Sequence, residues 1–346
     1  MSAQLAGSPL SIIAPLPAAC RLPADYDRHG PSVAQQRRAL LALVGDIDWP
    51  QRSWRELIEL LLRLGRTDIA LSRLAEGHVD ALRILAQAGA APRPPATGAG
   101  PALYGVWASR SMRTGVSGRW CDDGRLRIDG TLRFASGAGL LDRALVPVWI
   151  DADHHLLVDL PTDGLPVDPS VWRTGAMAAS RTYELRIAGA VAEPDQVVGA
   201  PDFYLDRPGF FPGGVGVAAC WTGGAVRVVD LLRSRHATVT PAQQRRLGTI
   251  RADLVAATAA VRLAAARLDE ILPTEPSDWQ VLATEARLCA AAAIRRIIAD
   301  ARLLTGPAGV AMDDDLAHAL PDLELYVLQQ NADADAMLLG DPERIP

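Results

Sequence analysis

The sequence contains no lysine, because all 35 of its basic residues are arginine. Without lysine the chain cannot form a Schiff base, supply the lysine of an ATP phosphate loop or use a lysine amine as a general base. Aromatic residues are scarce, at 5%. Acidic residues outnumber basic ones by 40 to 35, and the net charge of -5 makes nucleic acid an unfavourable partner.

Cysteine is also sparse. The four cysteines, Cys20, Cys121, Cys220 and Cys289, lie far apart and form no C-x-x-C pair. This spacing argues against zinc ribbons and thioredoxin-like redox motifs, so we expect no metal site. Buried or incidental thiols in a reducing compartment account for these residues, and we expect a cytoplasmic protein.

Long hydrophobic runs are missing as well. The apolar run from Leu10 to Cys20 has no basic residues before it, and Pro15 and Pro17 interrupt it. These features favour an irregular leader strand over a signal peptide. No stretch approaches the ~20 uncharged apolar residues that a membrane helix needs, so we expect no membrane segment.

Helical patterns occupy both ends of the chain. Apolar residues recur at spacings of three and four between residues 33 and 89. The predicted helices there are Val33–Val44, Trp54–Leu64 and Thr67–Ala88, and those near the other end are 215–234, 241–272, 275–304 and 316–339. Ser53 and Glu56 have capping-box spacing, and Thr67 is a candidate cap for the third helix. Long helices with short connections predict an antiparallel bundle.

The middle of the chain has a different pattern. A segment rich in Gly, Pro and Ala, residues 89–101, cannot hold a helix and marks a domain boundary. Short runs typical of strands follow it, separated by Gly, Asp and Pro. The predicted strands are 103–108, 125–134, 143–150, 155–160 and 181–188. We therefore expect an antiparallel β domain between two helical regions.

Four segments, in this order, resemble motifs of the acyl-CoA dehydrogenase family of flavoproteins. Residues 65–78 are similar to the last helix of the family's N-terminal domain, and residues 130–142 to its strand G-x-K-x-W-I-T-N-G-x-x-A-D. Residues 172–180, followed by Val197–Gly199, resemble the later strand and its V-L-G turn. Residues 302–309 stand where the family has the loop Q-x-x-G-G-x-G.

The resemblance implies an α+β, acyl-CoA dehydrogenase-like fold. Residues 1–98 would form an N-terminal helical domain with an irregular leader. Residues 99–212 would form a middle antiparallel β domain that carries the flavin face, and residues 213–346 a C-terminal four-helix bundle.

The resemblance also implies bound FAD. Phe134 stands where the family has an aromatic ring that stacks on the isoalloxazine, and Ser136 where a hydroxyl bonds near N5. Trp107 and Ser109 belong to the strand that contacts the pyrimidine edge of the flavin.

The bundle would supply the remaining FAD contacts. Arg233 or Arg235 would hold the diphosphate of a neighbouring subunit's cofactor, since a guanidinium grips phosphate through two bonds. Gly306 and Gly309 would let the backbone approach the adenine half. A solvated helix-end arginine and a plain helix C-cap are the alternative interpretations.

The family's catalytic base is missing from this sequence. A Glu normally follows the Tyr of Y-E-G-T, and here Tyr326 is followed by Val327; the second base position known among relatives falls near Val217. Valine accepts no proton, and loss of a general base typically costs ~10²–10⁴-fold in rate. The backbone N–H of Val327 remains available to polarise a carbonyl. Glu324, three residues earlier, is the candidate substitute base, with a solvated carboxylate as its alternative.

The acyl pocket implied by the resemblance would contain Glu76, His78 and Tyr326. His78 is a candidate general base near neutral pH, or simply a packed histidine.

Three functions fit these residues. The first is an FAD-dependent oxidoreductase, either an acyl-thioester α,β-dehydrogenase with a displaced base or an oxidase or monooxygenase that needs no such base. The second is a catalytically inactive acyl-CoA dehydrogenase-like subunit in a heteromer, and the third is an acyl-CoA binding protein without flavin. The expected partners are acyl-CoA or another acyl substrate, electron-transfer flavoprotein, and a second copy of the chain in a homodimer or homotetramer.

Overall fold

The computed structural model describes residues 14–98, 100–110, 114–235, 239–270 and 276–341. The chain forms two compact units, and each unit is built from separate stretches of sequence. We name them the helical unit (Met1–Arg21, Arg52–Ser72 and Phe211–Pro346) and the sheet unit (Leu22–Gln51 and Arg73–Phe210). Part of the predicted leader, residues 1–13, lies outside the described residues, and residues 14–23 have no regular secondary structure.

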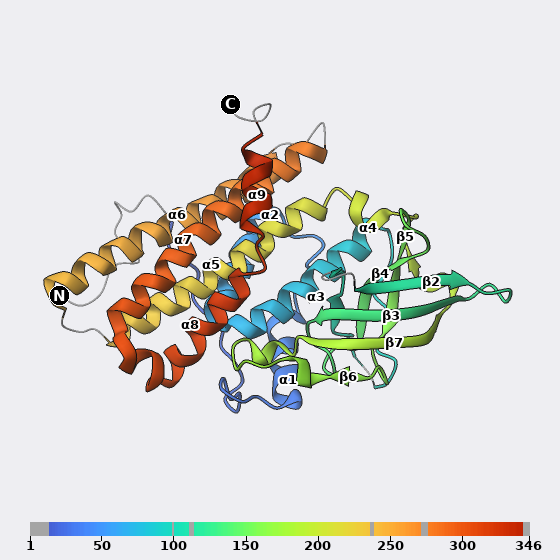
Figure 1. Ribbon diagram of the computed structural model, residues 1–346, viewed down its shortest axis with the longest axis horizontal. Coiled ribbons are helices and arrows are strands. Elements are labelled where there is room, and N and C mark those ends of the chain that lie inside the picture. Colours follow the sequence, from blue (N-terminus) through green and yellow to red (C-terminus); the bar gives the residue numbers. More distant parts are fainter. Residues whose placement is uncertain (1–13, 99, 111–113, 236–238, 271–275, 342–346) are drawn as a thin grey trace. The chain divides into compact units, whose positions relative to one another are not determined.

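The helical unit contains the long helices near the C-terminus. They are α5 (Phe210–Arg235), α6 (Pro241–Glu270), α7 (Pro276–Ala311), α8 (Asp314–Val327) and α9 (Ala332–Leu339), joined by α2 (Trp54–Thr67). Helices α6 and α7 lie side by side along much of their length (Figure 1). The predicted helix over 316–339 is interrupted after Val327, so α8 and α9 are separate helices.

The helices α2 and α5 cross at glycines. A Cβ atom on Gly65 would lie 2.2 Å from the carbonyl oxygen of Cys220, and a Cβ atom on Gly223 would lie 2.2 Å from that of Leu62. Any side chain at either position would push the two backbones apart. These glycines therefore allow the closest approach of α2 to α5.

One of the two predicted caps is confirmed. At the start of α2 the Ser53 hydroxyl accepts from the Glu56 N–H (3.2 Å), and the Glu56 carboxylate accepts from the Ser53 N–H (3.0 Å). The prediction that Thr67 caps the third helix, α3 (Ile69–Gln87), is wrong, because Thr67 is the last residue of α2 and its hydroxyl donates to the Arg63 carbonyl. Asp68 accepts from the Leu71 N–H instead.

The sheet unit holds α1 (Val33–Val44), as predicted, and a sheet of eight strands in the described residues. The strands are β1 (Tyr104–Val106), β2 (Gly115–Trp120), β3 (Leu126–Ala135), β4 (Arg143–Trp149), β5 (His155–Pro161), β6 (Val167–Asp168), β7 (Tyr183–Ala192) and β8 (Val197–Val198). Their order is β6-β7-β3-β2-β4-β5-β8, and β1 pairs with β4. The sheet is antiparallel except that β1 and β2 both run parallel to β4, which the sequence did not predict.

The core of the sheet unit lies between α3 and the strands. Ala81, Ile84 and Leu85 of α3 pack with Tyr104, Leu145 and Leu157. Their spacing of three and four residues places these α3 side chains on one helix face. This packing fixes the face of α3 that carries His78 beside the start of β1.

One helix among the described residues, α5, is long and apolar enough to cross a membrane. Its most apolar window is 78% buried inside the protein, which is typical of a core helix. The helix predicted over 215–234 is confirmed and lies within α5, which begins at Phe210 and ends at Arg235.

Candidate functional site

The end of β3 presents an exposed aromatic ring. The pairing of β3 with β7 shifts register between Leu132 and Ala135, which forms an irregularity at Arg133 and Phe134. Phe134 has φ 57° and is 54% exposed, although most other aromatic side chains of this chain are at least half-buried. A bulky residue in the left-handed region is strained, and such strain is retained where the surrounding structure imposes it.

Ser136, two residues further on, is held in a chain of buried hydroxyls. Its Oγ lies 2.9 Å from Oγ1 of Thr182, which in turn lies 2.7 Å from Oγ of Ser180. All three side chains are less than 9% exposed. The predicted flavin strand therefore ends in one exposed ring and one buried, hydrogen-bonded hydroxyl.

Trp107 lies beneath this strand end. Its indole Nε1–H donates to the Ser136 carbonyl at 2.9 Å, and the residue is 3% exposed. The predicted contact of Trp107 with a cofactor is not supported, because the ring is buried and its N–H is already used. Trp107 instead fixes the backbone of Ser136. Ser109, which lies beyond the end of β1, is half-buried.

A short helical turn, η3 (Ala178–Ser180), supports the same region. The residues on either side of it, Met177 and Arg181, have φ 53° and 49°. The Gly137 N–H donates to the Ser180 carbonyl (2.9 Å), and the Ala138 N–H to that of Arg181 (3.2 Å). Three of the four non-glycine residues with positive φ in the described chain, Phe134 included, thus belong to these two adjoining segments.

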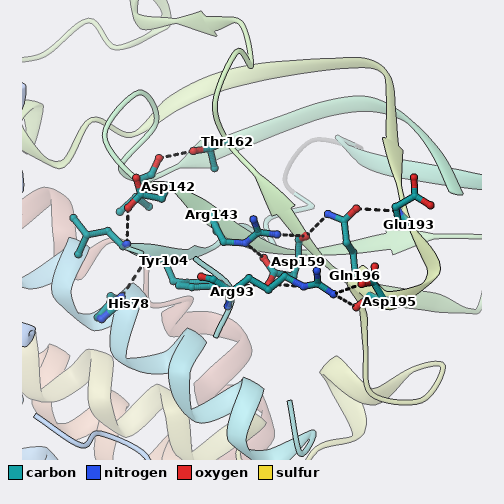
Figure 2. Close-up of polar contacts among 12 residues, drawn as sticks. His78, Arg93, Tyr104, Asp142, Arg143, Asp159, Thr162, Glu193, Asp195 and Gln196 are labelled. Atoms are coloured by element: carbon teal, nitrogen blue, oxygen red, sulfur yellow. Dashed lines mark hydrogen bonds and ion pairs between the residues drawn. The ribbon is translucent and has the colours of Figure 1, made fainter. Parts of the chain in front are cut away.

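His78 is a packed residue in the core of the sheet unit. Figure 2 shows its ring beside Tyr104, whose backbone N–H donates to His78 Nδ1 at 3.1 Å. Burial lowers the pKa of His78 to about 4, and Asp142 offsets part of this shift. Since Nδ1 accepts this bond and the ring is 6% exposed, the structure argues against the predicted general base.

Glu76, also predicted in the acyl pocket, forms an ion pair with Arg73 one helical turn earlier on α3 (2.7 Å). Its side chain is 10% exposed. A buried carboxylate with a guanidinium partner is a stable anion. The pair leaves Glu76 as a structural group of α3 rather than a proton acceptor.

A second buried network fixes the strands behind Tyr104. Arg143 Nε donates to Asp159 Oδ1 at 2.7 Å, and the Tyr104 hydroxyl donates to Asp159 Oδ2 at 3.1 Å (Figure 2). Burial raises the pKa of Asp159, while Arg143 and Tyr104 lower it. Burial and the neighbouring Asp159 also raise the pKa of Tyr104. The network ties β1, β4 and β5 together.

The predicted substitute base is paired. The carboxylate of Glu324 forms an ion pair with Arg302 of α7, and 47% of the Glu324 side chain is exposed. Val327 is the last residue of α8 and is 1% exposed. Because only the first amides of a helix lack intrahelical acceptors, the Val327 N–H belongs to the helix ladder. The prediction that the Val327 N–H polarises a substrate carbonyl is therefore not supported.

Two apolar groups accompany Val327 in the helical unit. Tyr326 is buried and packs edge-to-face against Trp221 of α5, with ring centroids 6.1 Å apart. Val217, at the family's other base position, is 8% exposed on α5. Neither position of the expected base carries an ionisable side chain.

The two candidate diphosphate arginines differ. Arg235 forms ion pairs with Asp313 and Asp315, so two carboxylates already offset its charge, and its predicted phosphate contact is not supported. Arg233 is partly exposed and has no ion pair within the described residues. Of the two arginines, Arg233 is therefore the one whose guanidinium is available for a phosphate.

The predicted glycine loop is a kink inside α7. Gly306 has φ 62° and ψ -169°, which interrupts the helix before Pro307. A Cβ atom on Gly306 would meet nothing within 4 Å, whereas one on Gly309 would lie 2.3 Å from Cβ of Thr305. Gly306 leaves its backbone open to a ligand, but Gly309 is explained by packing against Thr305.

The structure brings Phe134, Ser136 and Trp107 together and adds two residues that sequence reasoning did not single out, Ser180 and Thr182. Ser180 ends a segment that resembles the family, which was the one available signal. Within the described residues no group of three or more His, Cys, Asp or Glu side chains could hold a metal ion.

No protein-family model and no curated protein matches the sequence. Solved structures do match the fold. Dibenzothiophene monooxygenase from Paenibacillus sp. A11-2 superposes with a TM-score of 0.72 at 18% identity, over 91% of this chain and 90% of that chain. The FMN-bound form of that enzyme gives 0.73 at 17% identity, over 91% of each chain.

Two further structures give similar values. Methanesulfinate monooxygenase from Pseudomonas fluorescens gives 0.72 at 15% identity and 89% coverage of each chain. Butyryl-CoA dehydrogenase from Megasphaera elsdenii gives 0.72 at 16% identity, over 91% of this chain and 89% of that chain. The protein has an acyl-CoA dehydrogenase-like fold, with N-terminal helices, a middle β-sheet and a C-terminal helical domain.

Proposed function

We propose that this protein is a flavin-dependent oxidoreductase whose reaction does not begin with removal of an α-proton by a carboxylate. The observation that carries the proposal is the pair of apolar residues, Val217 and Val327, at both positions where the fold's dehydrogenases would need a base. The nearest substitute, Glu324, is held by Arg302. Oxidase or monooxygenase chemistry accommodates this arrangement.

The sheet unit contains residues that fit a flavin. The exposed Phe134 ring offers a flat apolar surface for an isoalloxazine, and ring stacking contributes about 0.5–1.5 kcal/mol beyond the area buried. Ser136 offers a hydroxyl two residues away. A bound flavin supplies hydride or single-electron transfer and reaction with dioxygen. FMN binding by the Paenibacillus enzyme supports FMN as the cofactor, and the family resemblance of the sequence supports FAD.

The proposed roles of the chain's residues follow from their contacts. Phe134 orients the cofactor ring, and Ser136 donates a hydrogen bond to it. Trp107 fixes the Ser136 carbonyl, which holds the strand end in place. In the helical unit, Arg233 offers a charge for a phosphate of a neighbouring subunit's cofactor, and Gly306 an open backbone surface.

The same apolar residues favour a second candidate, a catalytically inactive acyl-CoA dehydrogenase-like subunit that binds flavin or acyl-CoA within a heteromer. The two candidates differ in turnover. The first predicts that the reduced, flavin-loaded protein consumes dioxygen faster than free reduced flavin when a substrate is present. The second predicts no such difference, with co-purification of a catalytic subunit.

The experiment that separates dehydrogenation from the proposed chemistry is anaerobic mixing of the flavin-loaded protein with acyl-CoAs of several chain lengths. We expect no bleaching of the flavin absorbance. Val327→Glu is the companion variant, and Val327→Leu its control for volume. Bleaching of the wild-type protein would overturn the proposal in favour of a dehydrogenase, for which electron-transfer flavoprotein would be the acceptor.

We also propose that the protein assembles as a homodimer or homotetramer. Leu263 of α6 and Leu303 of α7 are 63% and 64% exposed, and Met312 is 84% exposed. These apolar side chains support an assembly surface on the helical unit. Light scattering across a concentration series tests it, and a monomer at all concentrations would contradict it.

A further inference from the structure

The three buried hydroxyls beside Phe134 form a chain with a defined number of protons. Ser136, Thr182 and Ser180 each carry one hydroxyl proton. Two oxygen–oxygen contacts, of 2.9 and 2.7 Å, connect the three groups through Thr182. Two protons fill these contacts, and one proton remains for an acceptor outside the chain.

Burial and the order of the contacts together indicate which residue keeps the remaining proton. Ser180 is 1% exposed, and its hydroxyl has no described acceptor other than Thr182. A proton left on Ser180 would be buried without an acceptor, which costs about 1–3 kcal/mol. Thr182 is about as exposed as Ser136, at 8% against 7%, but its oxygen already contacts both serines, whereas Ser136 contacts only Thr182. Ser136, 7% exposed and two residues from the exposed Phe134 ring, is the remaining position.

We infer that Thr182 and Ser180 are positioning residues that orient the Ser136 hydroxyl as a hydrogen-bond donor toward the cofactor. Ser180 donates to Thr182, Thr182 donates to Ser136, and Ser136 donates outward. Hydrogen bonds in such a chain polarise one another, so each donation strengthens the next. The inference rests on the proposed function, because it names residues that act on the same cofactor-binding strand.

The surrounding backbone holds the chain in this arrangement. Trp107 fixes the Ser136 carbonyl, and the Gly137 N–H binds the Ser180 carbonyl at 2.9 Å. The strained residues Met177 and Arg181 flank Ser180. The protein therefore maintains an unfavourable local conformation in the segment that carries two of the three hydroxyls, as expected where geometry serves a function.

The test compares Thr182→Val, which keeps the shape but loses the hydroxyl, with Thr182→Ser, which keeps the hydroxyl. Ser180→Ala removes the first donor of the chain. The readouts are the midpoint potential and visible spectrum of the bound flavin, and the Kd of the flavin-free protein for FMN and FAD. Thermal unfolding of the flavin-free variants reports on folding separately.

We expect Thr182→Val and Ser180→Ala to weaken flavin binding by about 2- to 10-fold and to shift the midpoint potential, because Ser136 loses its fixed direction. Thr182→Ser should retain the wild-type potential and spectrum. If all three variants match the wild type in potential and spectrum, the chain only supports folding and the inference is overturned, while the proposed function stands. If the wild-type protein binds neither flavin, both fail.

Discussion

His78 and Asp159 are buried in the sheet unit, and each takes its protonation state from its surroundings. His78 is kept neutral by the loss of water around the ring and by the Tyr104 N–H, which its Nδ1 accepts. Asp159 is 1% exposed, and Arg143 and Tyr104 supply bonds that offset part of its desolvation. Each residue therefore predicts a measurable effect on the stability of the protein.

The pKa of His78 predicts a loss of stability in mild acid. Its pKa lies at about 4 in the folded protein against 6.5 in the unfolded chain, so the unfolded chain binds an extra proton between these values. Stability from this residue is therefore present above pH 6.5 and falls as the pH is lowered toward 4. The full effect is about 3 kcal/mol.

Urea unfolding of the wild type and of His78→Gln, at pH 7.5 and pH 5, measures this contribution. The wild type should lose more stability than His78→Gln across this interval, and the exposed His29→Gln should behave like the wild type. The pKa of His154 is raised by Asp202, so this residue contributes a pH dependence of stability with the opposite sign. All three proteins share it, and it cancels when their stability losses are compared. Equal losses in the wild type and His78→Gln would contradict the account.

The Asp159 network predicts non-additive substitutions. Asp159→Leu leaves the buried guanidinium of Arg143 without its partner, which costs about 3–5 kcal/mol. The double variant Asp159→Leu with Arg143→Met removes both charges and should be more stable than Asp159→Leu alone. Denaturant unfolding measures both. A double variant that is less stable than the single one would show that the ion pair does not behave as a unit.

At the scale of elements, the crossing of α2 and α5 is the sharpest constraint in the helical unit. Gly65 and Gly223 face backbone atoms of the opposite helix. By contrast, Gly248 on α6 is exposed, and a Cβ atom there would meet nothing within 4 Å. The three glycines share a residue type but differ in what surrounds them.

Alanine substitution should therefore have opposite effects at these positions. Gly65→Ala and Gly223→Ala should each destabilise the protein by about 1–3 kcal/mol, through overpacking of the crossing. Gly248→Ala should stabilise it by about 0.5–1 kcal/mol, through helix propensity. Thermal unfolding distinguishes the two. A Gly223→Ala variant as stable as the wild type would mean that α5 moves away from α2 without cost.

Local patterns predicted most elements because the interactions that define them lie close together in sequence. The α1 helix and the Ser53–Glu56 cap are examples, since their bonds span three or four residues. The strand β2, Gly-Val-Ser-Gly-Arg-Trp, was missed because its two glycines break the alternating apolar pattern. It is specified by pairing with β3 and β4 instead.

The candidate site shows the same division. Phe134 and Ser136 were predicted from one motif, but their surroundings come from distant parts of the chain. Thr182 reaches Ser136 across 46 residues, and the Asp313 that neutralises Arg235 is 78 residues away. Such contacts depend on the sheet register and on helix packing, which no short window of sequence contains.

At the scale of the whole molecule, the fold is shared by monooxygenases and by butyryl-CoA dehydrogenase, at 15–18% identity. The fold is therefore compatible with both monooxygenation and dehydrogenation, and the residues at the site must decide between these reactions. The lysine-free chain has 40 acidic residues. The two positions where the dehydrogenases would need a base hold Val217 and Val327, so none of these acidic residues stands there.

The central claim is that a flavin binds against the Phe134 face of the sheet unit, and titration of the flavin-free protein with FMN and FAD tests it most directly. We expect saturable binding of at least one flavin, weakened about 2- to 10-fold by Phe134→Ala. Phe134→Trp should retain binding, and Trp120→Ala, at another exposed aromatic of the sheet, should leave it unchanged. A wild-type protein that binds neither flavin, or a Phe134→Ala variant that binds like the wild type, would contradict the claim.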